Sequence, residues 1–196
     1  MNTLSAKVIL YDLLSMIIPG YLVLFLIIKA FLPDFTWCYD NVTFGVVAFA
    51  ISYIVGLAIH WSAKLVFRSL RNCDCLVNKA KENVNKSHLR SDKPVTGDNV
   101  SYYDAYYFAS RFAWSSVPVL EAQYSFLRSA IIVEVLYMLF GCKAFSCPYL
   151  LSVVAGLLIV TILLMLSVLR ETHVRIWEDY AYIEQRRKSN GDDETY

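Results

Sequence analysis

The sequence contains little charge and almost no net charge. Asp, Glu, Lys and Arg make up 18% of its 196 residues, apolar residues make up 57%, and the formal net charge is +1. A composition this apolar is typical of a membrane protein rather than of a soluble domain. The near-neutral net charge argues against a dedicated nucleic-acid-binding protein, because such proteins usually carry an excess of basic residues. We therefore expect no direct binding of nucleic acid.

The sequence also lacks the motifs that mark common active sites. It contains no HExxH, no GxSxG, no phosphate-binding loop and no Asp-rich metal box. The ribonuclease pattern, in which four to six residues separate an arginine from a following histidine, is missing as well, because Arg170 and His173 are too closely spaced. Cys73 and Cys75 have no second Cys or His pair at the spacing of a zinc site. We therefore predict a protein that is not an enzyme and that uses no cofactor and no metal.

Four long apolar runs dominate what remains. A hydrocarbon core of ~30 Å requires about 20 apolar residues in a helix. The last run has 22 residues and no charge, which argues against the alternative of a soluble helical bundle. The first run is too long for a signal peptide and lacks a cleavage site, so we interpret it as an uncleaved span. We predict an all-α, polytopic membrane protein with four transmembrane helices at Ile9–Leu32, Phe44–Ala63, Ala130–Phe145 and Pro148–Leu169.

The lysines and arginines predict the orientation of these spans. Of the 18 Lys and Arg residues, all but Lys29 and Lys143 fall in the N-terminal segment, in the central segment between the second and third spans, or after the fourth span. Positively charged residues stay on the cytoplasmic side of a membrane. We therefore predict that the N-terminus, the central segment and the C-terminus are all cytoplasmic.

The predicted topology divides the chain into four parts. Residues 1–63 form the first two transmembrane helices, 64–129 a cytoplasmic helical insertion, 130–169 the last two transmembrane helices, and 170–196 a cytoplasmic helical extension with an acidic tail. The two cytoplasmic parts together form a helical head.

Turn-forming residues predict how the head is built. The segment Lys64–Leu89 is predicted to continue the second helix, and Arg90–Ser101 is predicted to be a loop because it is rich in Pro, Gly, Asp, Asn and Ser. A helix is predicted to resume at Tyr102 and to break near Pro118. The fourth helix has no stop signal and is predicted to continue to Lys188, which gives a helix about 60 Å long.

Two local patterns concern the packing of the spans. Pro19 and Gly20 lie inside the first span and predict a helix kink over Ser15–Ile18, as a packing bend or as a gating hinge. Ser52 and Gly56 have the small-xxx-small spacing that lets two helix backbones approach closely. The second span is therefore predicted to lie at the centre of the bundle.

An ionisable pair is predicted inside the membrane. Glu134 lies within the third span, where a carboxylate is costly and is often functional. His60 lies near the cytoplasmic end of the second span at a depth that could match Glu134, so the two could form a proton or cation site. The alternative is that Glu134 is neutral or forms a salt bridge with Arg128 or Lys64 at the interface.

The remaining cysteines and aromatic residues have two interpretations each. Cys38, Cys142 and Cys147 are predicted on the outer side, where Cys38 could pair with either of the others or all three could be free thiols. The run Tyr102–Phe108 could stack on bases, but few basic residues surround it. An aromatic helix face that packs in the head or lies at the membrane interface is the favoured interpretation.

Two motifs carry a resemblance to a known family. The segments YDLLSMIIPGYL (Tyr11–Leu22) and LEAQYSFLRS (Leu120–Ser129), together with the four predicted spans, resemble the four-pass membrane accessory protein of type VI-B CRISPR loci. Those loci use an RNA-guided RNase as effector. The resemblance implies a bacterial inner-membrane protein of antiviral defence that modulates a cytoplasmic effector nuclease, or that changes membrane permeability as a homo-oligomer.

Under this hypothesis we expect an interaction surface on the head, formed by Arg111, Glu121, Gln123 and Arg128. The alternative is a small oligomeric ion channel or transporter that uses Glu134 and His60. A membrane enzyme that acts on lipid has the least support, because the sequence offers neither a nucleophile constellation nor a metal site.

Overall fold

The computed structural model describes residues 3–32, 42–71, 73–88, 100–111, 115–145 and 149–189. Side chains are described throughout these ranges except for 3–12, 14, 42, 44, 87, 88, 108, 111, 142, 143 and 186–189. All the secondary structure in this part of the chain is α-helical, which confirms the predicted all-α fold class. The helices are α1 (Thr3–Phe31), α2 (Val42–Val66), α3 (Arg68–Arg71), α4 (Asp74–His88), α5 (Tyr102–Arg111), α6 (Val117–Ala144) and α7 (Leu150–Ser189).

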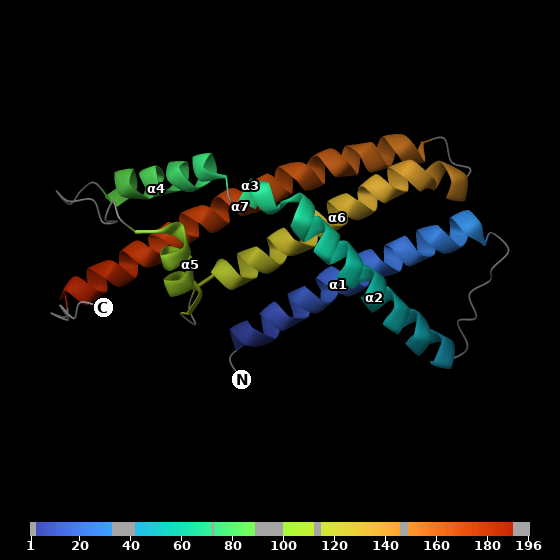
Figure 1. The fold of residues 1–196 in the computed structure, drawn as a ribbon, viewed down its shortest axis with the longest axis horizontal. Coiled ribbons are helices and arrows are strands. Elements are labelled where there is room, and N and C mark those ends of the chain that lie inside the picture. Colours follow the sequence, from blue (N-terminus) through green and yellow to red (C-terminus); the bar gives the residue numbers. More distant parts are fainter. Residues whose placement is uncertain are drawn as a thin grey trace.

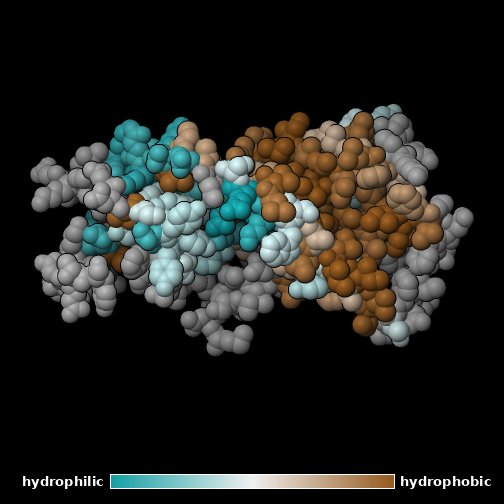
Figure 2. Space-filling model, viewed as in Figure 1, coloured by the Kyte–Doolittle hydropathy of each residue, from teal (hydrophilic) through white to brown (hydrophobic). Residues whose placement is uncertain are grey.

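The molecule is elongated and has an apolar half and a polar half (Figures 1 and 2). In the apolar half, α1 packs against α2 and α6, and α6 packs against the first part of α7. In the polar half, α4 and α5 pack against the second part of α7. The 40 residues of α7 therefore run through both halves as one continuous helix, as the missing stop signal predicted.

Three helices in the described part of the chain are long and apolar enough to cross a membrane. Their candidate spans are Gly45–Val66, Val117–Gly141 and Leu150–Gln185, and these contain or largely overlap the second, third and fourth predicted spans. The apolar segment Ser15–Phe31 in α1 is shorter. Many large apolar side chains of the three helices are exposed, for example Ile54 and Leu163, as contact with lipid requires.

The helices α1 and α2 cross with their backbones in close contact. A Cβ atom built on Gly20 would overlap the carbonyl oxygen of Ser52, and one built on Gly56 would overlap the carbonyl oxygen of Met16. Ser52 and Gly56 thus lie at a helix crossing, as their spacing predicted. The prediction that the second span lies at the centre of the bundle is wrong, because α6, which packs against α1, α2 and α7, has that position. Pro19, next to Gly20, is buried inside α1, which continues as a helix on both sides of it.

The prediction that the second helix continues to Leu89 is wrong. Helix α2 ends at Val66, and the chain then forms the short helix α3 and the separate helix α4. The reason is the apolar stripe of α4, where Val77, Ala80 and Val84 recur at helical spacing and pack against Trp177 of α7. A straight continuation of α2 could not lay this stripe along α7.

Two other predicted boundaries are confirmed. Helix α5 begins at Tyr102, and α6 begins at Val117 with Pro118 in its first turn. Ser115 stabilises this start, because its hydroxyl donates to Asp179 of α7 at 2.7 Å and accepts from the backbone N–H of Val117 at 3.2 Å. Of the predicted loop, residues 90–99 lie outside the described residues.

The crossing of α1 and α2 predicts different effects for two glycines of α2. Gly56→Ala inserts a Cβ where the backbone of Met16 lies, so we expect the unfolding free energy to fall by about 1–3 kcal/mol, the usual cost of overpacking. Gly45→Ala enters open space and should leave stability unchanged or slightly raised, since alanine favours helix over glycine. The measurement is detergent-denaturant unfolding of the purified protein followed by circular dichroism. Equal stabilities for the two variants would contradict the close crossing.

Candidate functional site

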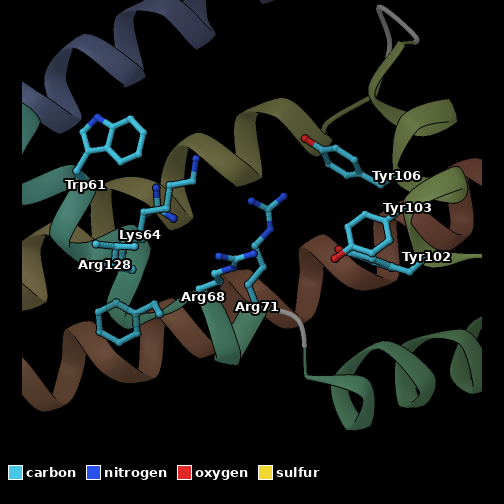
Figure 3. Close-up of a pocket in the computed structure, with 10 residues that line it drawn as sticks. Trp61, Lys64, Arg68, Arg71, Tyr102, Tyr103, Tyr106 and Arg128 are labelled. Carbon is cyan, nitrogen blue, oxygen red and sulfur yellow. The ribbon is translucent and has the colours of Figure 1, made fainter.

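A cavity of about 480 Å³ opens at the boundary between the apolar and polar halves. Four structural segments form its wall: the end of α2, the turn into α3, the tyrosine-bearing face of α5, and α6 (Figure 3). Basic and aromatic side chains predominate in the lining, which consists of Trp61, Lys64, Leu65, Phe67, Arg68, Arg71, Tyr102, Tyr103, Tyr106 and Arg128.

Helical spacing brings the basic residues of the first wall together. Lys64, Arg68 and Arg71 follow one another at intervals of one helical turn, so they lie on one side of the chain. The turn between α2 and α3 keeps this spacing, because the N–H of Phe67 donates to the carbonyl of Ala63 and that of Arg71 donates to the carbonyl of Phe67. The tyrosines of α5 face them from the opposite wall (Figure 3).

A hydrogen-bonded network joins α3, α5 and α6 beside this cavity. Arg71 Nη2 forms a salt bridge of 2.5 Å with Glu121 Oε1, and the Tyr106 hydroxyl donates to Glu121 Oε2 at 2.7 Å. The Arg71 guanidinium also lies 5.7 Å from the centre of the Tyr106 ring. Both oxygens of the Glu121 carboxylate are thus engaged within the protein.

The network favours the neutral form of Tyr106 and the charged form of Arg71. Burial, together with the negative charge of Glu121, raises the pKa of Tyr106 to about 12. Burial would lower the pKa of Arg71, but the attraction of Glu121 and the neighbouring tyrosines raises it above its ordinary value. At neutral pH, Tyr106 is therefore a hydrogen-bond donor and Arg71 is a cation.

Arg128 differs from Arg71 because it forms no salt bridge with a described residue, although the charge of Glu121 attracts it at longer range. It is only 7% exposed, and its Nη2 lies 3.1 Å from Ser125 Oγ and 3.3 Å from His60 Nε2. Its Nε is buried and makes no hydrogen bond with any described residue. A second cavity of about 250 Å³ shares Arg128, Arg71 and Tyr106 with the first.

The two residues of the predicted intramembrane site have separate partners. Glu134 Oε1 accepts a hydrogen bond of 2.7 Å from Thr161 of α7, and its Oε2 is buried without a hydrogen bond to the described residues. His60 lies 3.2 Å from Ser125 Oγ through Nδ1 and contacts Arg128 through Nε2. The predicted proton or cation site at these residues stays a prediction.

The four residues of the predicted interaction surface differ in their surroundings. Glu121 and Arg128 line cavities and contact other side chains of the protein, whereas Gln123 is half-buried on α6. The side chains of Arg111 and Cys142 are not described, and Cys38 and Cys147 lie outside the described residues. Cys73 and Cys75 are free thiols.

On α5, Tyr102 and Tyr106 pack against the cluster that contains Ile176 and Trp177, whereas Tyr103 and Tyr107 are exposed. The favoured interpretation of a packed aromatic face is therefore confirmed for one face of this helix. The ring of Tyr102 lies 5.2 Å from that of His173 and 6.4 Å from that of Trp177. The sequence analysis did not predict the basic cavity beside this run. The one-turn spacing of Lys64, Arg68 and Arg71 directly after an apolar span was a signal that could have indicated it.

Comparison of the chain with models of known protein families, with curated proteins and with solved structures gives no match.

The network predicts an energetic coupling between Arg71 and Glu121. In a double-mutant cycle with Arg71→Gln and Glu121→Gln, we expect a coupling free energy of about 1–2 kcal/mol, because the pair is part-buried and hydrogen-bonded. The pair of Lys86 and Glu82 on α4 is the matched control, and its coupling is expected to be smaller because both side chains are exposed to solvent. Thermal unfolding of the purified variants measures both cycles. A coupling no larger than that of the control would count against the network.

Proposed function

We propose that this protein is a four-span inner-membrane protein whose helical head lies in the cytoplasm and engages a cytoplasmic effector of a bacterial antiviral, CRISPR-like system. The observation that carries the proposal is the continuity of α7, which links the apolar half to a separately packed head. The antiviral assignment itself rests on the resemblance of Tyr11–Leu22 and Leu120–Ser129 to the accessory membrane protein of type VI-B CRISPR loci.

The length and packing of α1 support a fourth span. Its apolar segment Ser15–Phe31 is about 26 Å long at 1.5 Å per residue, close to a hydrocarbon core of ~30 Å, and the helix extends beyond this segment to Thr3. It packs against both α2 and α6. In Figure 1 the start of α1, the end of α2 and the end of α7 all point towards the polar half, which supports a common cytoplasmic side for the termini and the head.

The head has the properties of an independent packing unit. Its core consists of Ala80, Val84, Ala105, Ala109, Val117, Ile176, Trp177 and Ala181, which are all buried. Two tyrosines on its surface have large exposed fractions, 51% for Tyr107 and 52% for Tyr182. Exposed tyrosines supply a large contact area and a hydroxyl, and they are enriched at the centres of protein interfaces. We therefore assign partner contact to these tyrosines rather than to Glu121 and Arg128, which contact residues within the chain.

A phage-protection assay tests the proposal. The gene is expressed with its genomic neighbours. The double variant Tyr107→Ala/Tyr182→Ala is compared with the control Tyr149→Ala. Tyr149 is 75% exposed and lies at the start of α7, outside the head. We expect the double variant to lose protection by at least about tenfold, since each interface tyrosine contributes more than about 1 kcal/mol. The control should protect like the wild type.

Two measurements accompany this assay. Immunoblotting of membranes verifies equal abundance, and a variant that retains Cys75 alone reports orientation, because an impermeant maleimide should label it only after the cells are permeabilised. Unchanged protection by the double variant, or labelling of Cys75 in intact cells, would refute the proposal.

A channel or transporter is the second candidate, and one observation favours it. Glu134 lies inside the candidate span of α6, and one of its carboxylate oxygens is buried without a hydrogen bond to the described residues. A carboxylate in such a place often lies on an ion path. Four spans are few for a pore, so this function requires a homo-oligomer.

Flux measurements on liposomes test this second candidate. We expect a pH-dependent proton or cation flux that Glu134→Gln abolishes, because the neutral amide cannot take up or release a proton. Glu171→Gln, an exposed glutamate of α7, is the control and should leave the flux unchanged. No flux at any pH in reconstituted wild-type protein would exclude the channel.

A further inference from the structure

The cavity at the boundary carries more positive than negative charge. Lys64, Arg68, Arg71 and Arg128 line it, whereas the carboxylate of Glu121 is already bound by Arg71 and Tyr106. Lys64 lies 5.2 Å from the centre of the Trp61 ring, and both Lys64 and Arg68 are exposed at the rim. The cavity therefore offers several cationic donors to an anion.

Arg128 is the strongest sign that an anion belongs there. A buried guanidinium is costly unless a counter-charge and hydrogen-bond acceptors offset the loss of water. In the described part of the chain its hydrogen-bond partners are Ser125 and His60, and its guanidinium lies 5.7 Å from the centre of the Tyr124 ring. The charge of Glu121 attracts Arg128 without a salt bridge, and the Nε of Arg128 makes no hydrogen bond with a described residue. A phosphate oxygen entering the cavity would supply both the charge and the acceptor.

The surroundings of the cavity indicate an amphiphilic ligand. Trp61 and Leu65 line its rim, with exposed fractions of 57% and 69%, and they belong to the last turns of the candidate span of α2. Acyl chains that pass along this end of α2 would cover these side chains while the headgroup enters among the arginines. Basic pockets between transmembrane helices on the cytoplasmic side are known binding sites for anionic lipid headgroups.

We propose that this cavity binds the phosphate headgroup of an anionic phospholipid, with Arg128 and Arg68 contacting the phosphate and Lys64 at the rim. The inference rests on the proposed membrane orientation, which puts the cavity at the cytoplasmic surface of the bilayer. It adds a ligand that the proposed role in defence does not require.

Lipid binding by the purified full chain in detergent tests the inference. The probes are dioctanoyl-phosphatidylglycerol, dioctanoylglycerol without a phosphate, and AMP as a soluble phosphate ester, each titrated with native mass spectrometry as readout. We expect phosphatidylglycerol to bind at least about tenfold more tightly than the other two, since one charged hydrogen bond contributes about tenfold or more in affinity.

Two double variants locate the binding. Lys64→Gln/Arg68→Gln should weaken phosphatidylglycerol binding about tenfold or more, whereas Lys79→Gln/Arg175→Gln removes the same two charge types outside the cavity and should change it less than twofold. All four of these side chains are exposed, so the fold is expected to survive. A third variant, Arg128→Gln, should remove the rise in melting temperature that phosphatidylglycerol gives the wild type.

Three results would overturn the inference. Equal weakening by the two double variants would mean non-specific attraction, and equal binding of dioctanoylglycerol would mean that the phosphate is not recognised. Tight binding of AMP that depends on Lys64 and Arg68 would make the ligand a soluble phosphate ester instead of a lipid. Each of these results can occur while Tyr107 and Tyr182 remain essential for phage protection, so a failure here is separate from a failure of the proposed function.

Discussion

The two halves of this molecule depend on one shared element, the helix α7. In its first part Met165 and Leu169 are buried against Tyr124 and Ile131 of α6, and two turns later Ile176 and Trp177 are buried against α4 and α5. No break separates these two sets of contacts. Because an α-helix is stiff over this length, a tilt of the first part of α7 would be transmitted to the polar half, which is held by the same helix.

At the boundary between the two halves, ion pairs and hydrogen bonds join the helices in place of apolar contacts. Helix α2 ends there, and the chain changes within a few residues from exposed apolar side chains such as Leu65 to a group of cations. Glu121 neutralises Arg71 and draws Tyr106 of α5 towards α6. Arg128 remains buried without a salt bridge to a described residue, so the cationic character of this region is only partly compensated within the protein.

Much of this architecture was predictable because long apolar runs, small residues and prolines each affect the helix in which they lie. The second, third and fourth spans, the helix start near Pro118 and the unbroken α7 all follow from such signals. The break between α2 and α4 was not predictable in the same way, because it depends on the packing of Val77, Ala80 and Val84 with Trp177, which lies far away in the sequence. The cavity was missed for the same reason, since α2, α3, α5 and α6 each contribute only a part of it.

The packing of the head also sets the order in which the protein can be assembled during synthesis. Helices α4 and α5 leave the ribosome well before Ile176, Trp177 and Ala181, the residues on which their apolar faces are buried. Until that part of α7 has been translated, the stripe containing Ala80 and Val84 has no core to join. A nascent chain of this protein therefore carries an amphipathic helix, α4, whose apolar stripe stays uncovered until the second part of α7 has been made.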